Sequence, residues 1–215
     1  MNVLIACEES QRVCAAFLNR GHNAFSCDIL PPSGGMHDRH IQGDVIPLIN
    51  GCCDFETMNG DKHNISTPWD LIIAHPPCTY LSNAGARHLY PGGQLNKERY
   101  EKGKRAKWFF MQFLLSTAVR VCVENPIPSR IYELIPYTQI IQPYEFGDPY
   151  TKRTCLWLRN LPRLTPTNIV TPKDTFCPSS KHVPGHGRGQ HTTDRQRERS
   201  KTFRGIALAM AEQWG

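Results

Sequence analysis

The sequence predicts an α/β protein built on a doubly wound, mostly parallel, Rossmann-like sheet. Short apolar runs alternate with helical stretches of apolar periodicity from residue 3 to residue 158, which is typical of parallel sheets. Acidic or reactive residues follow successive runs, as expected at the carboxyl ends of parallel strands. The chain has 215 residues, 40% hydrophobic and 20% charged, which is enough for one sizeable domain.

The first predicted elements form a strand, a helix and a second strand. Residues 3–6 are a short apolar run, and residues 13–17 carry apolar side chains at helical spacing. Gly21 is expected to end this helix, because glycine adopts the backbone conformation that closes helices. The second strand is expected over residues 24–27 and is followed by Asp28.

The middle of the chain predicts two more strands separated by an irregular excursion. Residues 40–45 are expected to form a short edge segment, whereas residues 50–68 are polar and predict a surface excursion without regular structure. Residues 71–74 are all apolar and predict a buried parallel strand. Pro76 and Pro77 must end that strand, because proline fixes φ and lacks a backbone donor.

The second half of the chain completes the sheet. Residues 104–119 predict a helix that is apolar nearly all round, and therefore buried on more than one side. Strands are expected over residues 120–123, 138–142 and 154–158, and a closing helix over residues 206–214.

The amino-acid composition indicates the cellular compartment and the type of binding partner. Nine cysteines at irregular spacing indicate reduced thiols in the cytosol rather than a disulfide framework. No apolar run reaches the roughly 18 residues that cross a bilayer, and the amino terminus lacks a signal-peptide pattern. We therefore expect a cytoplasmic protein without a membrane partner. The formal charge of +6 weakly favours a polyanionic partner such as nucleic acid.

Cys78 is the most informative residue of the sequence. It follows a buried strand and a proline pair, so its side chain is held at the sheet edge where ligands gather. The pattern predicts a positioned nucleophile. The alternative is an inert cysteine that fills space, which is common for free cysteines.

Three acids follow other predicted strands, namely Asp28, Asp44 and Glu124. Because parallel strands end at one edge, these acids and Cys78 are expected to line one crevice. An acid after the second strand commonly binds ribose hydroxyls, although Asp28 and Asp44 could equally cap turns. A thiolate beside Glu124 suits attack on an electron-poor ring, with the acid protonating a ring nitrogen and a ring carbon becoming methyl-accepting.

These residues resemble the motifs of the DNA cytosine carbon-5 methyltransferases. Residues 70–85, Asp-Leu-Ile-Ile-Ala-His-Pro-Pro-Cys-Thr-Tyr-Leu-Ser-Asn-Ala-Gly, are similar to the nucleophile motif of that family, and Glu124-Asn125 to a later motif. Gly43-Asp44-Val45 and Asp28 resemble the third and second motifs. The chain more narrowly resembles compact phage and prophage members, over residues 3–160 and the carboxyl terminus.

The resemblance implies methylation of cytosine at carbon 5 in DNA, with S-adenosylmethionine as cofactor. Cys78 would attack carbon 6, Glu124 would contact the cytosine edge, Asn125 would brace that turn, and Arg153 would stand in the eighth motif. The expected cofactor contacts are Glu8, Ser10, Asp28, Asp44, Pro76, Ser200 and Thr202. The cytosine would flip out of duplex DNA, or come from a single strand. The expected DNA contacts, whose alternative is a solvated helix start, are Ser82, Lys97, Arg99, Lys104, Arg105, Arg188 and Arg195.

The chain also departs from the family. Residues 6–11 lack the glycines of the first motif, Cys155 stands where the eighth motif has a second arginine, and the asparagine of the tenth motif is absent. Residues 1–165 correspond to the catalytic domain and residues 200–215 to a returning helix. Residues 166–199 replace the target-recognition domain with a short segment rich in proline, glycine, histidine and arginine, too short for a core of its own.

That segment contains residues of the types that bind zinc. The spacing matches no standard zinc finger, so we expect a polar DNA-facing loop and no metal; the residues concerned are Cys177, His182, His186 and His191.

Three other functions compete with this interpretation. An exocyclic-amine methyltransferase is disfavoured, because His75 and Cys78 flank the prolines where an amine acceptor and an aromatic ring would be needed. A methyltransferase of free cytosine nucleotides would explain the missing recognition domain. A catalytically silent DNA-binding relative would explain the altered motifs, but both Cys78 and Glu124 are retained. The target sequence and the oligomeric state are not predictable from the sequence.

Overall fold

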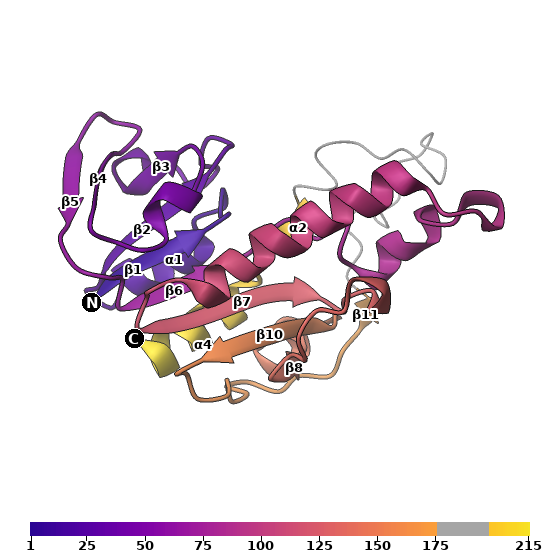
Figure 1. Ribbon diagram of the computed structural model, residues 1–215. Helices are drawn as coiled ribbons and strands as arrows, with labels where there is room; N and C mark the ends of the chain where they lie inside the picture. The colour runs from indigo at the N-terminus through magenta and orange to yellow at the C-terminus, as the bar shows by residue number, and fades with distance from the viewer. Residues whose placement is uncertain (176–197) are drawn as a thin grey trace, which may run out of the picture.

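The computed structural model describes residues 1–175 and 198–215. Its centre is a seven-stranded sheet in the order β3-β2-β1-β6-β7-β10-β8 (Figure 1). The strands are β1 (Asn2–Ala6), β2 (Asn23–Asp28), β3 (His40–Gln42), β6 (Leu71–Ala74), β7 (Arg120–Pro126), β8 (Gln139–Ile141) and β10 (Thr154–Arg159).

The strand directions confirm the predicted mostly parallel sheet. Strands β3, β2, β1, β6 and β7 pair in parallel, whereas β10 pairs antiparallel with both β7 and β8. The strand order reverses between β1 and β6, which makes the carboxyl ends of these two strands the switch point of the sheet. Ligands of open α/β sheets bind at such a point.

Helices cover both faces of the sheet, as expected for a doubly wound fold. Helices α1 (Arg12–Leu18) and α4 (Arg204–Trp214) pack together on one face, and α2 (Lys97–Leu115) packs on the other. Alternate residues of each strand serve the two cores, because side chains of a strand point to opposite faces. In β1, Val3 and Ile5 join the core under α1 and α4, while Leu4 and Ala6 join the core under α2.

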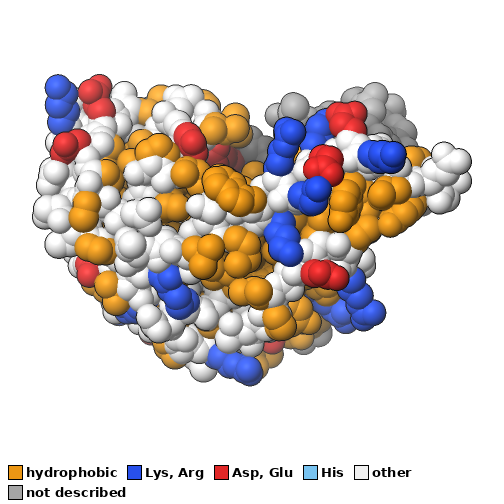
Figure 2. All heavy atoms as spheres, in the orientation of Figure 1, with side chains coloured by type: hydrophobic (Ala, Val, Ile, Leu, Met, Phe, Trp, Pro, Cys, Tyr) orange, Lys and Arg blue, Asp and Glu red, His pale blue; other side chains and the backbone are white. Residues whose placement is uncertain are grey.

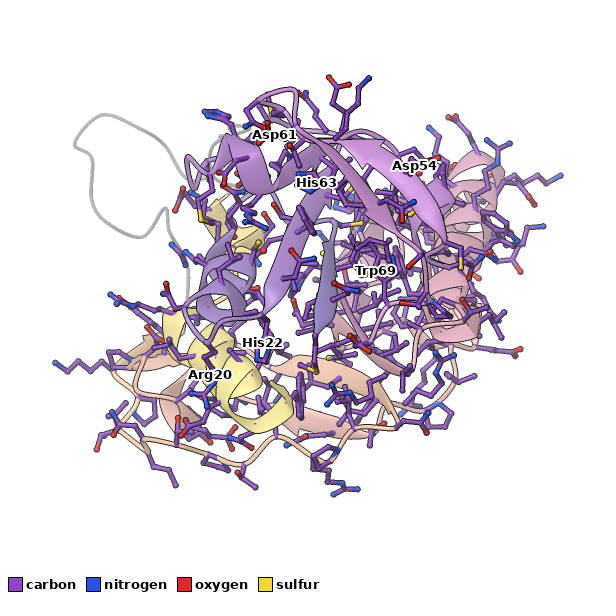
Figure 3. All side chains as sticks on the ribbon, turned by 90° about the vertical axis from the view of Figure 1, so that its left-hand side faces the viewer. Arg20, His22, Asp54, Asp61, His63 and Trp69 are labelled. Carbon is purple, nitrogen blue, oxygen red and sulfur yellow. The ribbon has the colours of Figure 1, made fainter. Side chains whose placement is uncertain are left out.

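The excursion predicted for residues 50–68 is wrong, because this stretch contains an antiparallel hairpin. Strands β4 (Cys53–Glu56) and β5 (Lys62–Ile65) pair with each other. The hairpin buries Phe55, whose ring centroid lies 5.0 Å from that of Phe25, and His63 stacks on Phe55 at 5.5 Å. Figure 3 shows His63 and Trp69 on the side of the molecule that carries this hairpin. The strands escaped prediction because polar residues occupy most of their positions.

Helix α2 differs from its prediction in extent and in burial. It begins at Lys97, because the Asn96 side chain accepts a hydrogen bond from the Arg99 backbone at 3.0 Å and caps the helix. Trp108 is 59% exposed and Leu115 is 72% exposed, so the expected burial on several sides is wrong. Figure 1 shows the amino-terminal part of α2 projecting beyond the sheet.

The remaining elements are short. Strands β9 (Tyr150–Thr151) and β11 (Asp174–Thr175) form a two-stranded parallel sheet, and the 3-10 helix η3 (Asn83–His88) follows the loop after Cys78. Among the described helices, none combines the length and the apolar character that a membrane span requires.

Candidate active site

Four predicted site residues lie at the carboxyl ends of parallel strands. Asp28 ends β2, Asp44 follows β3, Cys78 follows β6, and Glu124 lies near the end of β7. Because β3, β2, β6 and β7 all run in the same direction, the residues emerge at one edge of the sheet. The edge therefore combines a thiol with three carboxylates.

Cys78 is partly exposed and lies in a hydrogen-bonded turn. Its carbonyl accepts hydrogen bonds from the backbone N–H groups of Leu81 at 3.2 Å and Ser82 at 2.9 Å. Burial raises the pKa of the thiol, and the nearby Glu124 carboxylate raises it further, while Lys152 and Arg199 partly oppose the shift. The thiol is therefore protonated at rest, and substrate binding must provide the conditions for its ionisation.

Glu124 forms a buried pair with His75. The His75 Nδ1 atom lies 2.9 Å from Glu124 Oε2, and the two side chains are only 8% and 13% exposed. Burial opposes the charge on both groups, yet the hydrogen bond and mutual attraction prevail: the pKa of Glu124 is lowered and that of His75 is raised. The contact thus favours the form in which His75 is an imidazolium and Glu124 a carboxylate.

Asn125 connects β7 to the proline turn. Its side chain is 1% exposed in the fold and donates from Nδ2 to the Pro76 carbonyl at 2.8 Å. Its Oδ1 atom makes no hydrogen bond with the described part of the chain. A buried amide in this position fixes the distance between the Pro76 turn and the strand that carries Glu124.

The carboxyl-terminal segment reaches the same edge through Lys152. The Lys152 ammonium donates to the Arg199 carbonyl at 2.9 Å, and its charge helps to lower the pKa of Glu124. A small hollow here is lined by Glu124, Lys152, Thr154, Thr202, Phe203 and Ile206. The structure thus brings Thr202 close to Glu124, whereas Arg153 is exposed between β9 and β10.

The turn after β1 holds the predicted cofactor residues Glu8 and Ser10. The Glu8 carboxylate accepts hydrogen bonds from the backbone N–H groups of Val13 at 2.7 Å and Cys14 at 3.1 Å, and the Ser10 hydroxyl donates to it at 3.4 Å. Glu8 is therefore directed at the first turn of α1, and its contact with a cofactor stays a prediction. Burial, followed by the charges of Asp28 and Asp44, raises the pKa of Cys7, so this turn adjoins both carboxylates.

Asp28 and Asp44 also cap turns. The Asp28 carboxylate accepts a hydrogen bond from Leu30 N at 2.9 Å, and that of Asp44 accepts one from Ile46 N at 3.0 Å. Turn capping, the alternative noted from the sequence, is thus present in the structure. Their contact with a cofactor, like that of Pro76 and Ser200, stays a prediction.

Two of the residues predicted to contact DNA also support the protein's own backbone, and their contact with DNA stays a prediction. Ser82 is 6% exposed and accepts a hydrogen bond from Gly85 N at 3.3 Å, capping η3. Arg99 donates to the carbonyls of Thr79 at 2.9 Å and Gly85 at 3.2 Å, and its guanidinium lies 5.0 Å from the Tyr80 ring centroid. Both residues therefore hold the loop that follows Cys78.

The remaining basic residues of this region divide into paired and unpaired side chains. Lys104 forms an ion pair with Glu101 at 2.7 Å, which agrees with a solvated helix face. Lys97 and Arg105 are exposed and form no ion pair with the residues that the structure describes. Figure 2 shows Lys and Arg side chains intermixed with acidic ones over α2. Arg188 and Arg195 lie outside the described residues.

The structure therefore adds His75 and Lys152 to the predicted site. His75 directly precedes the proline pair, and Lys152 directly precedes Arg153, so each stands next to a residue that the sequence singles out. Within residues 1–175 and 198–215, no three His, Cys, Asp or Glu side chains are grouped to hold a metal. The zinc-type residues of the sequence, Cys177, His182, His186 and His191, lie outside these ranges.

Comparisons with known proteins give structural likenesses at low sequence identity. No protein-family model matches the sequence, and no curated protein does. A crystal structure from E. coli, described as a "putative DNA modification methyltransferase encoded within prophage", superposes with a TM-score of 0.47 at 14% identity and covers 80% of this chain. The chain spans about half (52%) of the length of that protein. A likeness at this level carries no information about activity.

Proposed function

We propose that the protein is an S-adenosylmethionine-dependent methyltransferase that acts on cytosine at carbon 5 in DNA. The observation that carries this proposal is that Cys78, behind a proline pair, and the buried Glu124 carboxylate belong to the carboxyl ends of two neighbouring parallel strands. Asn125 ties the two segments together through Pro76. A nucleophile and an acid held at one sheet edge are what attack on an electron-poor pyrimidine requires. The likeness of residues 70–85 to the nucleophile motif of the cytosine carbon-5 methyltransferases supports the same reaction.

In the proposed reaction, the Cys78 thiol loses its proton to solvent and its sulfur forms a bond to carbon 6. Glu124 delivers a proton to ring nitrogen 3 as the electrons of the ring shift, which leaves carbon 5 nucleophilic. S-adenosylmethionine, when bound, supplies the electrophilic methyl group. Loss of the carbon 5 proton to a solvent base then expels Cys78, while nitrogen 3 returns its proton to Glu124.

The residues near the turn after β1 fit such a cofactor. Carboxylates at the ends of β2 and β3 suit the hydroxyls and the amino group of a nucleoside, and Cys7 lies close to both Asp28 and Asp44. Ile29 is 75% exposed and Leu30 is 46% exposed directly after Asp28. Exposed apolar side chains beside a carboxylate suit a flat base next to its ribose.

The position of Cys78 indicates in which form the cytosine must be presented to it. Because Cys78 follows β6 at the sheet edge and is only partly exposed, a cytosine must leave the base stack to reach it. Lys97 and Arg105, which α2 carries past the sheet, are available for phosphate contacts. Such contacts position DNA without specifying its sequence.

The direct test measures methyl transfer from a radiolabelled donor to duplex DNA, single-stranded DNA and a cytosine nucleotide. We expect transfer to DNA by the natural protein and none above background by Cys78→Ala, because the covalent step then has no nucleophile. Cys52→Ala is the matched control, since Cys52 is an exposed free thiol outside the site, and it should keep full activity.

DNA containing 5-fluorocytosine gives the second readout of the same prediction. Fluorine at carbon 5 blocks the final elimination, so a covalent protein–DNA adduct should appear by mass spectrometry and disappear in Cys78→Ala. Absence of methyl transfer to all three substrates would refute the proposed enzymatic activity. Transfer that survives Cys78→Ala would refute the covalent mechanism alone.

A further inference from the structure

His75 and Glu124 are brought together by the register of two parallel strands. Ala74 of β6 is paired with Val123 of β7, so the next residues along the two strands, His75 and Glu124, are neighbours. The His75 backbone N–H donates to the Ala6 carbonyl at 2.9 Å, which continues the β1–β6 ladder by one residue. The sheet itself therefore fixes both side chains, before any substrate is present.

The environment of the pair is charged on several sides. Glu8, in the turn after β1, attracts the His75 ring, while Lys152 repels it and attracts Glu124. The Glu124 charge also acts on three thiols, those of Cys78 in the turn after β6, Cys122 and Cys155. Of these groups, His75 is the one that hydrogen-bonds to Glu124, at 2.9 Å.

The two nitrogens of the His75 ring differ in their surroundings, and Nδ1 is the nitrogen that can exchange a proton with Glu124. Nε2 is buried and makes no hydrogen bond to any residue of the described ranges. An imidazolium carries an N–H at both nitrogens, so the protonated ring keeps one buried donor unsatisfied, which is costly. When the ring gives up the Nδ1 proton, its remaining N–H stays on Nε2, and Nδ1 can regain a proton from Glu124 through the existing 2.9 Å contact.

We infer that His75 is a positioning residue that aligns the Glu124 carboxylate and holds on its ring the proton that Glu124 passes to the pyrimidine. This inference rests on the proposed function and deepens it, because an ionised Glu124 has no proton of its own to give. As Cys78 sulfur bonds to carbon 6, nitrogen 3 takes a proton from Glu124, and Glu124 takes the Nδ1 proton of His75. The ring is neutral in the adduct, and both transfers reverse when Cys78 is expelled.

The first measurement is an NMR titration of His75 in the full-length protein without substrate. We expect the ring to titrate above the ordinary histidine value in the natural protein, and at a lower pH in Glu124→Gln, which removes the attracting charge. A His75 ring that titrates at or below the ordinary value in the natural protein would overturn the inference. This measurement does not depend on methyl transfer.

The second measurement compares kcat and DNA affinity for His75→Gln. Glutamine can still donate a hydrogen bond to Glu124 but cannot supply a proton, so we expect kcat to fall by about 10²-fold or more, with Kd for DNA changed less than about threefold. His63→Gln is the matched control, because His63 also has a buried Nε2 without a partner in the described chain but lies in the β4–β5 hairpin (Figure 3). It should keep the natural kcat.

The outcomes separate this inference from the function on which it rests. Unchanged kcat in His75→Gln, with methylation by the natural protein, would overturn the role of His75 and leave the methyltransferase standing. A natural protein that methylates no substrate would overturn the proposed function and this inference with it. Thermal unfolding of both histidine variants shows whether a loss of kcat reflects a loss of folded protein.

Discussion

At the scale of single residues, Cys7 adopts a backbone conformation that carries an energetic cost. Its φ angle is 59°, in the left-handed region that L-residues other than glycine rarely adopt. Forcing a side chain into this region costs about 1–2 kcal/mol. The first motif of the resembled family has glycine in this turn. Cys7 therefore adopts, in this turn, a backbone conformation that is typical of glycine.

This strain predicts the order of stability of two variants. Cys7→Gly should be more stable than Cys7→Ala by about 1 kcal/mol, because only glycine adopts the left-handed conformation without steric cost. Urea unfolding gives the comparison. Cys27 in β2 is the control, since glycine in a strand interior should be less stable than alanine by roughly 0.5–1 kcal/mol. Equal stability of the two Cys7 variants would mean that the turn carries no such strain.

The residue scale also shows which part of the site was predictable. Cys78 and Glu124 follow apolar runs that are recognisable by themselves, so local pattern and strand direction were enough to place them at one edge. The role of His75 depends on the pairing of Ala74 with Val123, which the sequence does not reveal. Lys152 acts on Glu124 through a segment that the Arg199 carbonyl holds in place, and this contact joins distant parts of the chain.

At the scale of elements, the packing of α2 depends on one glycine. A Cβ atom at Gly103 would collide with the ring of Tyr132, which is 5% exposed. The close approach also explains why a glycine is tolerated inside a helix, where it is worse than alanine by about 1 kcal/mol. The short 3-10 helix η5 (Arg130–Tyr132) is thus held against α2.

Gly103→Ala should therefore destabilise the protein although alanine is the better helix former. Overpacking typically costs about 1–3 kcal/mol, and we expect a cost near the upper end of that range here. Because alanine has the better helix propensity, the net loss in the free energy of unfolding is about 1–2 kcal/mol. Such a loss corresponds to a fall in Tm of roughly 2–8 °C at this size. In a Tyr132→Ala background the same substitution should become neutral or stabilising. A Tm that falls equally in both backgrounds would exclude the collision as the cause.

The helices and strands differ in how far their own stretch of sequence is enough to predict them. The buried strands of the sheet were predicted to within one residue or two at most ends, except β7, because they consist of continuous apolar runs. The β4–β5 hairpin was missed, because it buries mainly Phe55 and Ile65 and its other positions are polar or half-exposed. The start of α2 was missed, because its first turns are stabilised by the Asn96 cap and by exposed charges rather than by an apolar stripe.

At the scale of the whole molecule, the basic residues for which DNA contact is proposed differ in their partners within the described chain. Arg99 supports the loop after Cys78, and Lys104 and Lys102 pair with glutamates of the same helix. Lys97 and Arg105 stay exposed near the projecting end of α2 (Figure 1). DNA that reaches Cys78 would then contact this end of α2, and the hairpin at β4 and β5 would lie away from it.

The salt dependence of DNA binding tests this orientation. Each phosphate contact releases counterions and contributes about 0.9 to the slope of log K against log salt for duplex DNA. Lys97→Ala and Arg105→Ala should each reduce the slope by about 1, measured by fluorescence anisotropy on a duplex between about 50 and 200 mM salt. Lys62→Ala, which removes an exposed charge from β5, should leave the slope unchanged. A slope that falls with Lys62 but not with Lys97 or Arg105 would place the DNA on the hairpin side, and the approach to Cys78 would then have to come from there.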